Sequence, residues 1–483
     1  MTEVTIVQSR VELEDPHNCT DSNDVLTVFE ALFEALVRFA PGGGFEPGLA
    51  ERWTVSEDAR VWTFHLRADA KFHNGDAADA EAVKHSLERM ARPEMGVTLG
   101  APGVYAQYLG GAEIDVLARD QVRVRTTAPL ADLLDILVYG YILPPSVLAE
   151  AGAAFAEAPV GSGPYCFESY EPGVEVTLRA NAAYHGEAPP YERVTWRACG
   201  GAEARLDALM SGEAQIANAL APAAKGVLDR SAGHSAVEYL SPTAYIYLLN
   251  AARGPLSDPR LRRALNLAVD RRALIAEVLQ GAGQPLEGFV SPVHFGAGRD
   301  GPDTDPQDTG PEEVHRLLTA AGYPDGLTLA VDCPTRLPDE AEALTAALAR
   351  QLAGVGIALE VHRVEDRTAY AHQVRLKQIH DLCVFDSSPM STFRVLKEKI
   401  DSRTAGSWWQ GYRNPEVEAL LDGAAATVDP ETRASLYRRC YGLLQQDPPW
   451  LTLYNHRQLI GLTGSHEGWS MRFDGLLDPR RLP

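Results

Sequence analysis

The sequence lacks long apolar runs and an excess of basic residues. No stretch approaches the roughly 18 consecutive apolar residues that a membrane-spanning helix needs. Its 483 residues include 44 Lys and Arg against 66 Asp and Glu, which gives a formal net charge of −22. Nucleic acids and anionic membranes favour a basic surface, so neither is expected as the main partner.

Metal-binding spacings are also absent. None of the six cysteines forms a C-x-x-C pair, and no two of the 13 histidines lie three or four residues apart. Most cysteines, such as Cys166 and Cys383, have apolar neighbours, which predicts small buried side chains. Neither a protein-only metal site nor a cofactor is therefore expected.

No short catalytic motif occurs. The sequence has no G-x-S-x-G, no G-x-x-x-x-G-K-[ST] and no H-E-x-x-H. We therefore expect a protein that is not an enzyme, although distant residues can also assemble a catalytic site.

The pattern of apolar residues predicts a mixed α/β protein. Residues 61–67 alternate as a half-buried strand does, and residues 79–90 have helical spacing behind a possible Asp79 cap. Helices are also predicted over 24–39 and from 258 to about 279. Helix and strand then alternate from 312 to 364, which is typical of an α/β domain. Two stretches rich in Gly, Pro or Asp, 99–111 and 299–313, are predicted loops.

Several long sequence segments, which we call phrases, resemble one protein family. They occur in the same order as in that family. They include Phe45–Asp58, Trp62–Arg67, Lys71–Asp76, Pro159–Tyr165 and Asp258–Arg271. The sequence is similar to the peptide/nickel solute-binding proteins of ABC transporters, family 5, from residue 13 to 454.

The resemblance implies a two-lobed periplasmic-binding-protein-like fold of type II, peptide-binding subclass, with an extra N-terminal subdomain. Lobe I would be discontinuous, the extra subdomain would follow its first segment, and lobe II would complete the chain. The implied boundaries are 1–40 with 157–242 and 456–483 for lobe I, 41–156 for the subdomain and 243–455 for lobe II.

The resemblance also implies a site for a cationic group. In peptide-binding members an aspartate of a W-x-x-D-x-x-x-P-x-x-F stretch pairs with the α-amino group of the ligand. The matching stretch is Cys383–Phe393, with Asp386 at the aspartate and Phe393 at the closing aromatic residue. Cys383 replaces the tryptophan, and Pro389 stands one place early. An alternative is that Asp386 only caps a turn.

Further candidates are aromatic residues that could stack on a ligand, and basic residues that could meet its carboxylate. Each aromatic residue could instead belong to the core, and the basic residues could be solvated helix charges. The aromatic candidates are Tyr105, Tyr108, Tyr245, Tyr247, Trp408 and Trp409, and the basic ones are Arg394 and Lys397.

The expected function is the solute-binding component of an ABC importer, taking a small peptide or peptide-like ligand into an interlobe cleft by hinge closure. Its expected partners are the permease and ATPase subunits, and it is expected to be a monomer. One alternative is a metal–chelate binder, and another is an intracellular sensor or enzyme that reuses the fold.

Residues 1–7 lack the basic and apolar segments of a secretory signal. The expected location is periplasmic or cell-surface if a signal is missing from this sequence. The alternative is a cytoplasmic location.

Overall fold

The computed structural model describes residues 2–19, 22–97, 103–298, 310–335, 340–387 and 390–483. The chain divides into two compact units: unit 1 is residues 1–239 with 458–483, and unit 2 is residues 240–457. The divisions fall inside β12 (His234–Leu249) and β17 (Trp450–Thr463), so each of these strands contributes to both units.

The main sheet of unit 1 is built around the first strand of the chain. Its strand order is β11-β1-β10-β9-β8, so β1 lies between two strands that come much later in the sequence. Ile6 of β1 is the register partner of Trp196 on β10 and of Ile216 on β11, and both pairings are parallel. The bounds are β1 Glu3–Gln8, β8 Tyr165–Glu171, β9 Glu175–Ala180, β10 Arg193–Ala198 and β11 Ile216–Leu220.

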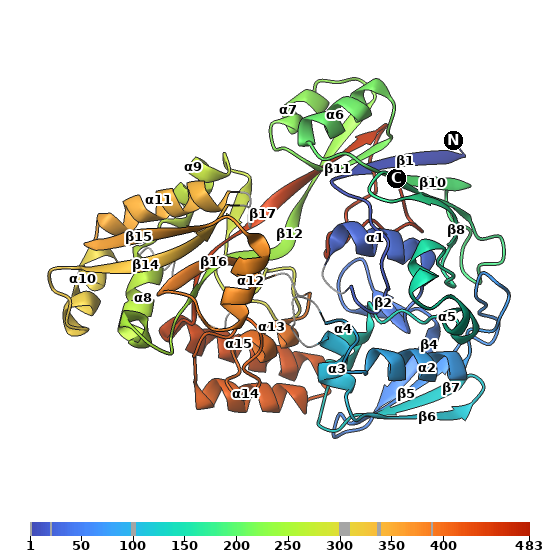
Figure 1. The fold of residues 1–483 in the computed structure, drawn as a ribbon, viewed down its shortest axis with the longest axis horizontal. Coiled ribbons are helices and arrows are strands. Elements are labelled where there is room, and N and C mark those ends of the chain that lie inside the picture. Colours follow the sequence, from blue (N-terminus) through green and yellow to red (C-terminus); the bar gives the residue numbers. More distant parts are fainter. Residues whose placement is uncertain (1, 20–21, 98–102, 299–309, 336–339, 388–389) are drawn as a thin grey trace. The chain divides into compact units, whose positions relative to one another are not determined.

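A separate antiparallel sheet in unit 1 has the order β4-β5-β7-β6. The alternation predicted for 61–67 is confirmed, because Trp62, Phe64 and Leu66 of β5 are buried. α2 packs against this sheet (Figure 1), and Asp79 caps the helix as predicted, accepting a hydrogen bond from the backbone N–H of Ala82 at 3.3 Å. The bounds are β4 Ala50–Val55, β5 Val61–Leu66, β6 Glu113–Ala118, β7 Gln121–Arg125 and α2 Ala80–Met90.

Two of the family-like phrases contact each other in unit 1. The Gly161 N–H donates to His73 Nδ1 at 3.2 Å, and His73 Nε2 lies 3.1 Å from the carbonyl oxygen of Gly163. Burial lowers the pKa of His73, which favours the neutral ring that this pair of bonds requires. A Cβ at Gly161 would lie 1.9 Å from the carbonyl oxygen of Leu32, so only glycine fits there.

The sheet of unit 2 has the order β15-β14-β16-β12-β17, with β13 paired to β17. β14 runs parallel to both of its neighbours, and β12 is antiparallel to β16. The helices α8, α9 and α11 contribute apolar side chains to one buried core with this sheet, and α11 lies along β14 and β15 (Figure 1). The bounds are α8 Pro259–Ala268, α9 Arg271–Val278, β13 Gly283–Pro285, β14 Leu327–Pro334, α11 Ala341–Ala353, β15 Ile357–Val364 and β16 Leu382–Ser387.

The other elements connect these sheets or cover them. In unit 1 they are α1 Asn23–Leu32, β2 Val37–Phe39, β3 Phe45–Pro47, α3 Val104–Leu109, α4 Leu133–Leu137, α5 Pro145–Ala151, a 3₁₀ helix Gly152–Glu157, α6 Ala202–Ser211 and α7 Ala224–Leu228. In unit 2 they are a 3₁₀ helix Pro255–Ser257, α10 Gly310–Ala320, α12 Arg367–Arg375, α13 Thr392–Lys399, α14 Pro415–Ala425 and α15 Pro430–Gln446.

The helix predicted over 24–39 is too long, because α1 ends at Leu32. The carbonyl groups of Glu34, Ala35 and Leu36 accept hydrogen bonds from backbone N–H groups far along the chain, at Ile142, Leu49 and Ala50. These tertiary bonds take the place of the helical ones. The apolar spacing was misleading because every residue from 32 to 37 is buried, whichever way it points.

The helix predicted from 258 to about 279 is two helices. α8 ends at Ala268, Val269 is extended, and Asp270 begins α9 by accepting from the Ala273 N–H at 2.9 Å. An internal cap of this kind gives the backbone an alternative to continuing the first helix.

The two predicted loops are only partly described. Within 99–111 the structure has the short helix α3, so Tyr105 and Tyr108 are helical, and residues 98–102 lie outside the described residues. Residues 299–309 of the second loop also lie outside the described residues, and α10 begins at Gly310.

The cysteine prediction is confirmed for five residues. All six cysteines are free thiols, and all except Cys199 are buried.

Within the described ranges, no helix is both long enough and apolar enough to cross a bilayer.

Candidate functional site

Asp386 lies near the carboxyl end of β16, where it is the register partner of Tyr245 on β12. Opposite residues of an antiparallel pair present their side chains on the same face of the sheet. Both side chains are half-buried, whereas the next pair inward, Tyr247 and Val384, is fully buried. The sheet therefore changes from apolar core to partly exposed polar surface between these two pairs.

Tyr245 belongs to a stack of aromatic rings that the sequence did not predict. Its ring lies 4.4 Å from that of His456 and 5.5 Å from that of Tyr454, both on β17, and both pairs are stacked. His456 Nε2 lies 2.7 Å from Glu340 Oε1, and the Tyr454 hydroxyl donates to the same oxygen at 3.0 Å.

Glu340 is stabilised as a carboxylate by its partners in this stack. Burial opposes ionisation of Glu340, but its hydrogen bond and ion pair with His456 prevail and lower its pKa. Burial, together with the neighbouring Glu340 charge, raises the pKa of Tyr454, so its phenol remains a donor. Asp386 adds a second, half-buried carboxylate to this part of unit 2, and a carboxylate can form an ion pair with a cationic group.

Tyr247 lies in the core of unit 2. Its side chain is fully buried and its hydroxyl is 2.8 Å from the Thr345 hydroxyl on α11. Its contacts in the structure are thus those of a packing residue.

Trp408 packs against Phe385, the residue of β16 that precedes Asp386. Its ring is 4.4 Å from that of Phe385, and the Lys399 ammonium lies 5.8 Å from its centroid. Lys377 Nζ donates to the Gly406 and Ser407 carbonyl groups, so charged side chains hold the segment that carries Trp408. Burial, with a smaller effect of Arg375, lowers the pKa of Lys377 to about 8.

The candidates on α13 have partners in their own unit. Phe393 is buried. Arg394 Nε donates to Glu398 at 2.9 Å, and Lys397 Nζ donates to Asp401 at 2.5 Å. Arg394 is also buried, so it is not the solvated helix charge that the sequence allowed. Ser388 and Pro389, between Asp386 and this helix, lie outside the described residues.

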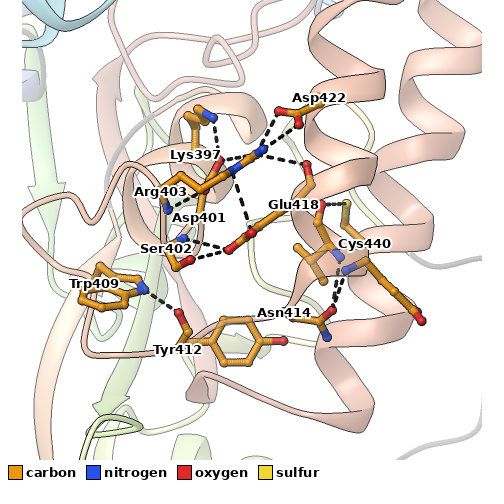
Figure 2. Close-up of polar contacts among 12 residues, drawn as sticks. Lys397, Asp401, Ser402, Arg403, Trp409, Tyr412, Asn414, Glu418, Asp422 and Cys440 are labelled. Atoms are coloured by element: carbon orange, nitrogen blue, oxygen red, sulfur yellow. Dashed lines mark hydrogen bonds and ion pairs between the residues drawn. The ribbon is translucent and has the colours of Figure 1, made fainter.

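A buried carboxylate anchors the segment after α13 (Figure 2). Asp401 is fully buried and accepts hydrogen bonds from Lys397 and from the Arg403 guanidinium, which also reaches Asp422 on α14. Further along the same segment, Trp409 Nε1 donates to the Tyr412 carbonyl at 2.6 Å (Figure 2). Both tryptophans are half-buried and are carried by a segment that these bonds fix.

The Asp401 anchor predicts an acid-sensitive contribution to stability. Burial opposes ionisation of Asp401, but hydrogen bonds from Arg403 and Lys397 outweigh it and lower the pKa to about 2. A carboxylate whose pKa is lower in the folded than in the unfolded state stabilises the fold. This effect is complete above the unfolded-state pKa, near 4, and is lost as the pH falls toward 2. We expect Asp401→Asn to lower the urea midpoint at pH 7, by an amount that shrinks between pH 4 and pH 2.

The matched control is Asp325→Asn, which removes an exposed carboxylate of the same unit. This substitution should leave the urea midpoint unchanged at pH 7 and at pH 2. An Asp401→Asn effect of equal size at pH 7 and pH 2 would contradict the assigned role of the charge.

The predicted candidates do not all belong to one unit. Tyr105, which is buried, and the half-buried Tyr108 are in unit 1, and the others are in unit 2. Within unit 2 the strands bring together Asp386 and Tyr245. The sequence analysis missed Tyr454, His456 and Glu340, because no local spacing relates residues separated by more than one hundred positions.

These features define a class of protein. The α/β fold matches two-lobed periplasmic binding proteins of known structure over nearly the whole chain. HbpA2 from Haemophilus parasuis has a TM-score of 0.85 at 20% identity, covering 99% of this chain and 98% of that chain. DppA from Helicobacter pylori, solved in complex with the peptide STSA, has a TM-score of 0.80 at 21% identity, covering 99% and 96%. The predicted fold class is confirmed.

The chain belongs to the bacterial extracellular solute-binding proteins, family 5, whose middle region it matches over residues 44–395. Among curated proteins, the glutathione-binding protein GsiB of Salmonella paratyphi A is 26% identical over 464 residues, 93% of this chain and 88% of that protein. GsiB is named as a binding protein, and the family is described as solute-binding. The chain is accordingly the solute-binding component of an ABC importer.

Proposed function

We propose that this protein captures a small peptide or peptide-like solute that carries a cationic group, and delivers it unchanged to the permease and ATPase subunits of its importer. Relatives with the same fold support the ligand class, since one is described as glutathione-binding and another was solved with a bound tetrapeptide. The protein would act as a monomer at the cell surface or in the periplasm, where the family is described as extracellular.

The observation that carries this proposal is the pairing of Asp386 with Tyr245 at the carboxyl edge of β16. Ligands of α/β sheets commonly bind at this edge of the strands. A carboxylate beside a half-buried tyrosine offers a cationic group both an ion pair and an aromatic face. Closure of two lobes on the solute, with the boundaries that the resemblance implies, is part of the same proposal.

Replacing Asp386 should weaken the binding of ligands that have a free amine. We expect Asp386→Asn to cost about 2–5 kcal/mol of binding free energy, because it removes one partner of a charge pair that loses its water on binding. Titration calorimetry with a panel of di- to tetrapeptides and reduced glutathione would measure this cost.

Two controls separate the role of Asp386 from the ligand class. N-acetyl forms of the same peptides lack the cationic amine, so they should bind weakly to the wild type and be nearly insensitive to Asp386→Asn. Asp325→Asn should bind every probe as the wild type does. A wild-type protein that binds no member of the panel would contradict the peptide proposal, whereas an Asp386→Asn variant within threefold of wild type would contradict only the assigned residue.

A further inference from the structure

Strands β14 and β15, with the residues just before β16, bring a buried carboxylate to two histidines. Asp332 of β14 is almost fully buried. The His380 ring lies with Nδ1 2.7 Å from Asp332 Oδ1, and the His380 backbone N–H donates to Asp332 Oδ2 at 2.8 Å. Asp332 is also the register partner of His362 on β15. The two imidazole rings stack, with centroids 4.2 Å apart and planes within 7°.

The bond to Asp332 determines which nitrogen of His380 is available. An ionised carboxylate only accepts hydrogen bonds, so Nδ1 carries the proton and the lone pair is on Nε2. A carboxylate that orients a histidine in this way is the usual partner of a metal-binding imidazole. The His380 and His362 side chains are 47% and 38% exposed, so an ion in solution can reach both rings.

The spacing of the two rings suits a shared ion. Two nitrogens bound to one ion at about 2.0–2.1 Å lie roughly 3 Å apart, which is within reach of rings whose centroids are 4.2 Å apart. Because each lone pair lies in its ring plane, the rings must turn out of their parallel stack to direct both nitrogens at one ion. Glu360 Oε1, two residues earlier on β15, is 3.5 Å from His362 Nε2 and adds negative charge beside the pair.

We propose that His380 Nε2 and His362 bind a divalent transition-metal ion, with water completing its coordination. In the described part of the chain, no three His, Cys, Asp or Glu side chains are arranged to hold a metal, so the site has two protein ligands. Imidazole nitrogens favour Cu²⁺ over Zn²⁺ and Ni²⁺, which makes Cu²⁺ the most sensitive probe.

This site is distinct from the solute site. Asp332 is in register with Cys383 on β16, so the two share a face of the sheet. Cys383 and Asp386 are three residues apart on that strand and therefore point to opposite faces. The metal proposal thus does not depend on the proposed solute.

The test is Cu²⁺ titration of the full-length protein without an affinity tag, by calorimetry and by electron paramagnetic resonance. We expect one saturable site with hyperfine structure from two imidazole nitrogens. Both His380→Ala and His362→Ala should weaken binding about tenfold or more, since either removes one of two protein ligands. Asp332→Asn should weaken it about 10- to 100-fold while leaving both imidazoles present, because it removes the orienting partner.

His315→Ala is the matched control, since it removes an exposed histidine of the same unit. It should bind Cu²⁺ as the wild type does, and circular dichroism of each variant would confirm an intact fold. The proposal is overturned if the His362/His380 double variant binds Cu²⁺ like the wild type, or if the bound ion shows only oxygen ligands. Failure of wild-type protein to bind Cu²⁺ saturably would overturn it equally.

Discussion

Residues 157–483 expressed alone are expected to leave their part of unit 1 unfolded, although they contain the whole of unit 2. This fragment lacks β1, which lies between β10 and β11. β1 pairs with β10 along its whole length and with β11 at Ile6 and Val7. Removing it separates the two neighbours and exposes the backbone groups that β1 satisfied, together with the apolar side chains that packed on Val4 and Ile6. Losing these hydrogen bonds together with the apolar packing is too costly for the sheet to persist.

The same fragment lacks α1, to which the chain's end is tied. The Leu477 N–H donates to the Thr27 hydroxyl at 3.2 Å, and Arg472 pairs with Glu30 at 2.9 Å. We therefore expect the fragment to bind a hydrophobic dye and to lack the part of the melting transition that belongs to unit 1.

The control is the complete chain cut between 156 and 157 at an inserted protease site. The cut chain keeps every strand, so its melting temperature should be close to that of the intact protein. If the isolated fragment unfolds with the same enthalpy as the cut chain and binds no dye, β1 is not required for the sheet of unit 1 to form.

Arg472→Met is expected to destabilise unit 1 by about 3–5 kcal/mol, because breaking a buried ion pair leaves its partners charged and without compensation. The Arg472 side chain is only 4% exposed. Its guanidinium donates to Glu30 at 2.9 Å and to Asp474 at 2.6 and 2.8 Å.

The surroundings of this arginine would compensate its two carboxylate partners only in part. Arg480 also donates to Glu30, at 3.1 Å, and the Tyr139 hydroxyl donates to Asp474 at 2.9 Å. Burial and the Asp474 charge raise the pKa of Tyr139, so its phenol remains protonated as a donor. Glu30, Tyr139, Arg472 and Asp474 are all buried, and methionine would fill the space of the arginine without replacing its bonds to the two carboxylates.

Urea denaturation followed by circular dichroism would measure the loss. Arg125→Met is the matched control, since Arg125 pairs with Glu113 at 3.3 Å with both side chains largely exposed. Exposed pairs contribute about 0–1 kcal/mol. An Arg472→Met variant as stable as Arg125→Met would show that the buried charges do not depend on this arginine.

The sequence by itself determined the local elements and the family. Alternation identified β5, and the Asp79 cap located the start of α2, because each signal lies within a few residues. The family followed from phrases whose order is a property of the chain alone. The sequence also predicted Asp386 and Tyr245 as site residues, and the structure shows them as one register pair.

Only the tertiary structure decided where α1 stops and which strands lie beside β1. Local spacing cannot show that backbone groups at Leu49 and Ile142 take the carbonyls that a longer α1 would have used. The same holds for the side chains gathered around Glu340, since Tyr454 and His456 reach it from more than one hundred residues away. Packing sets such partners, because strands pair where their buried faces and hydrogen bonds are jointly satisfied, whatever their separation in the sequence.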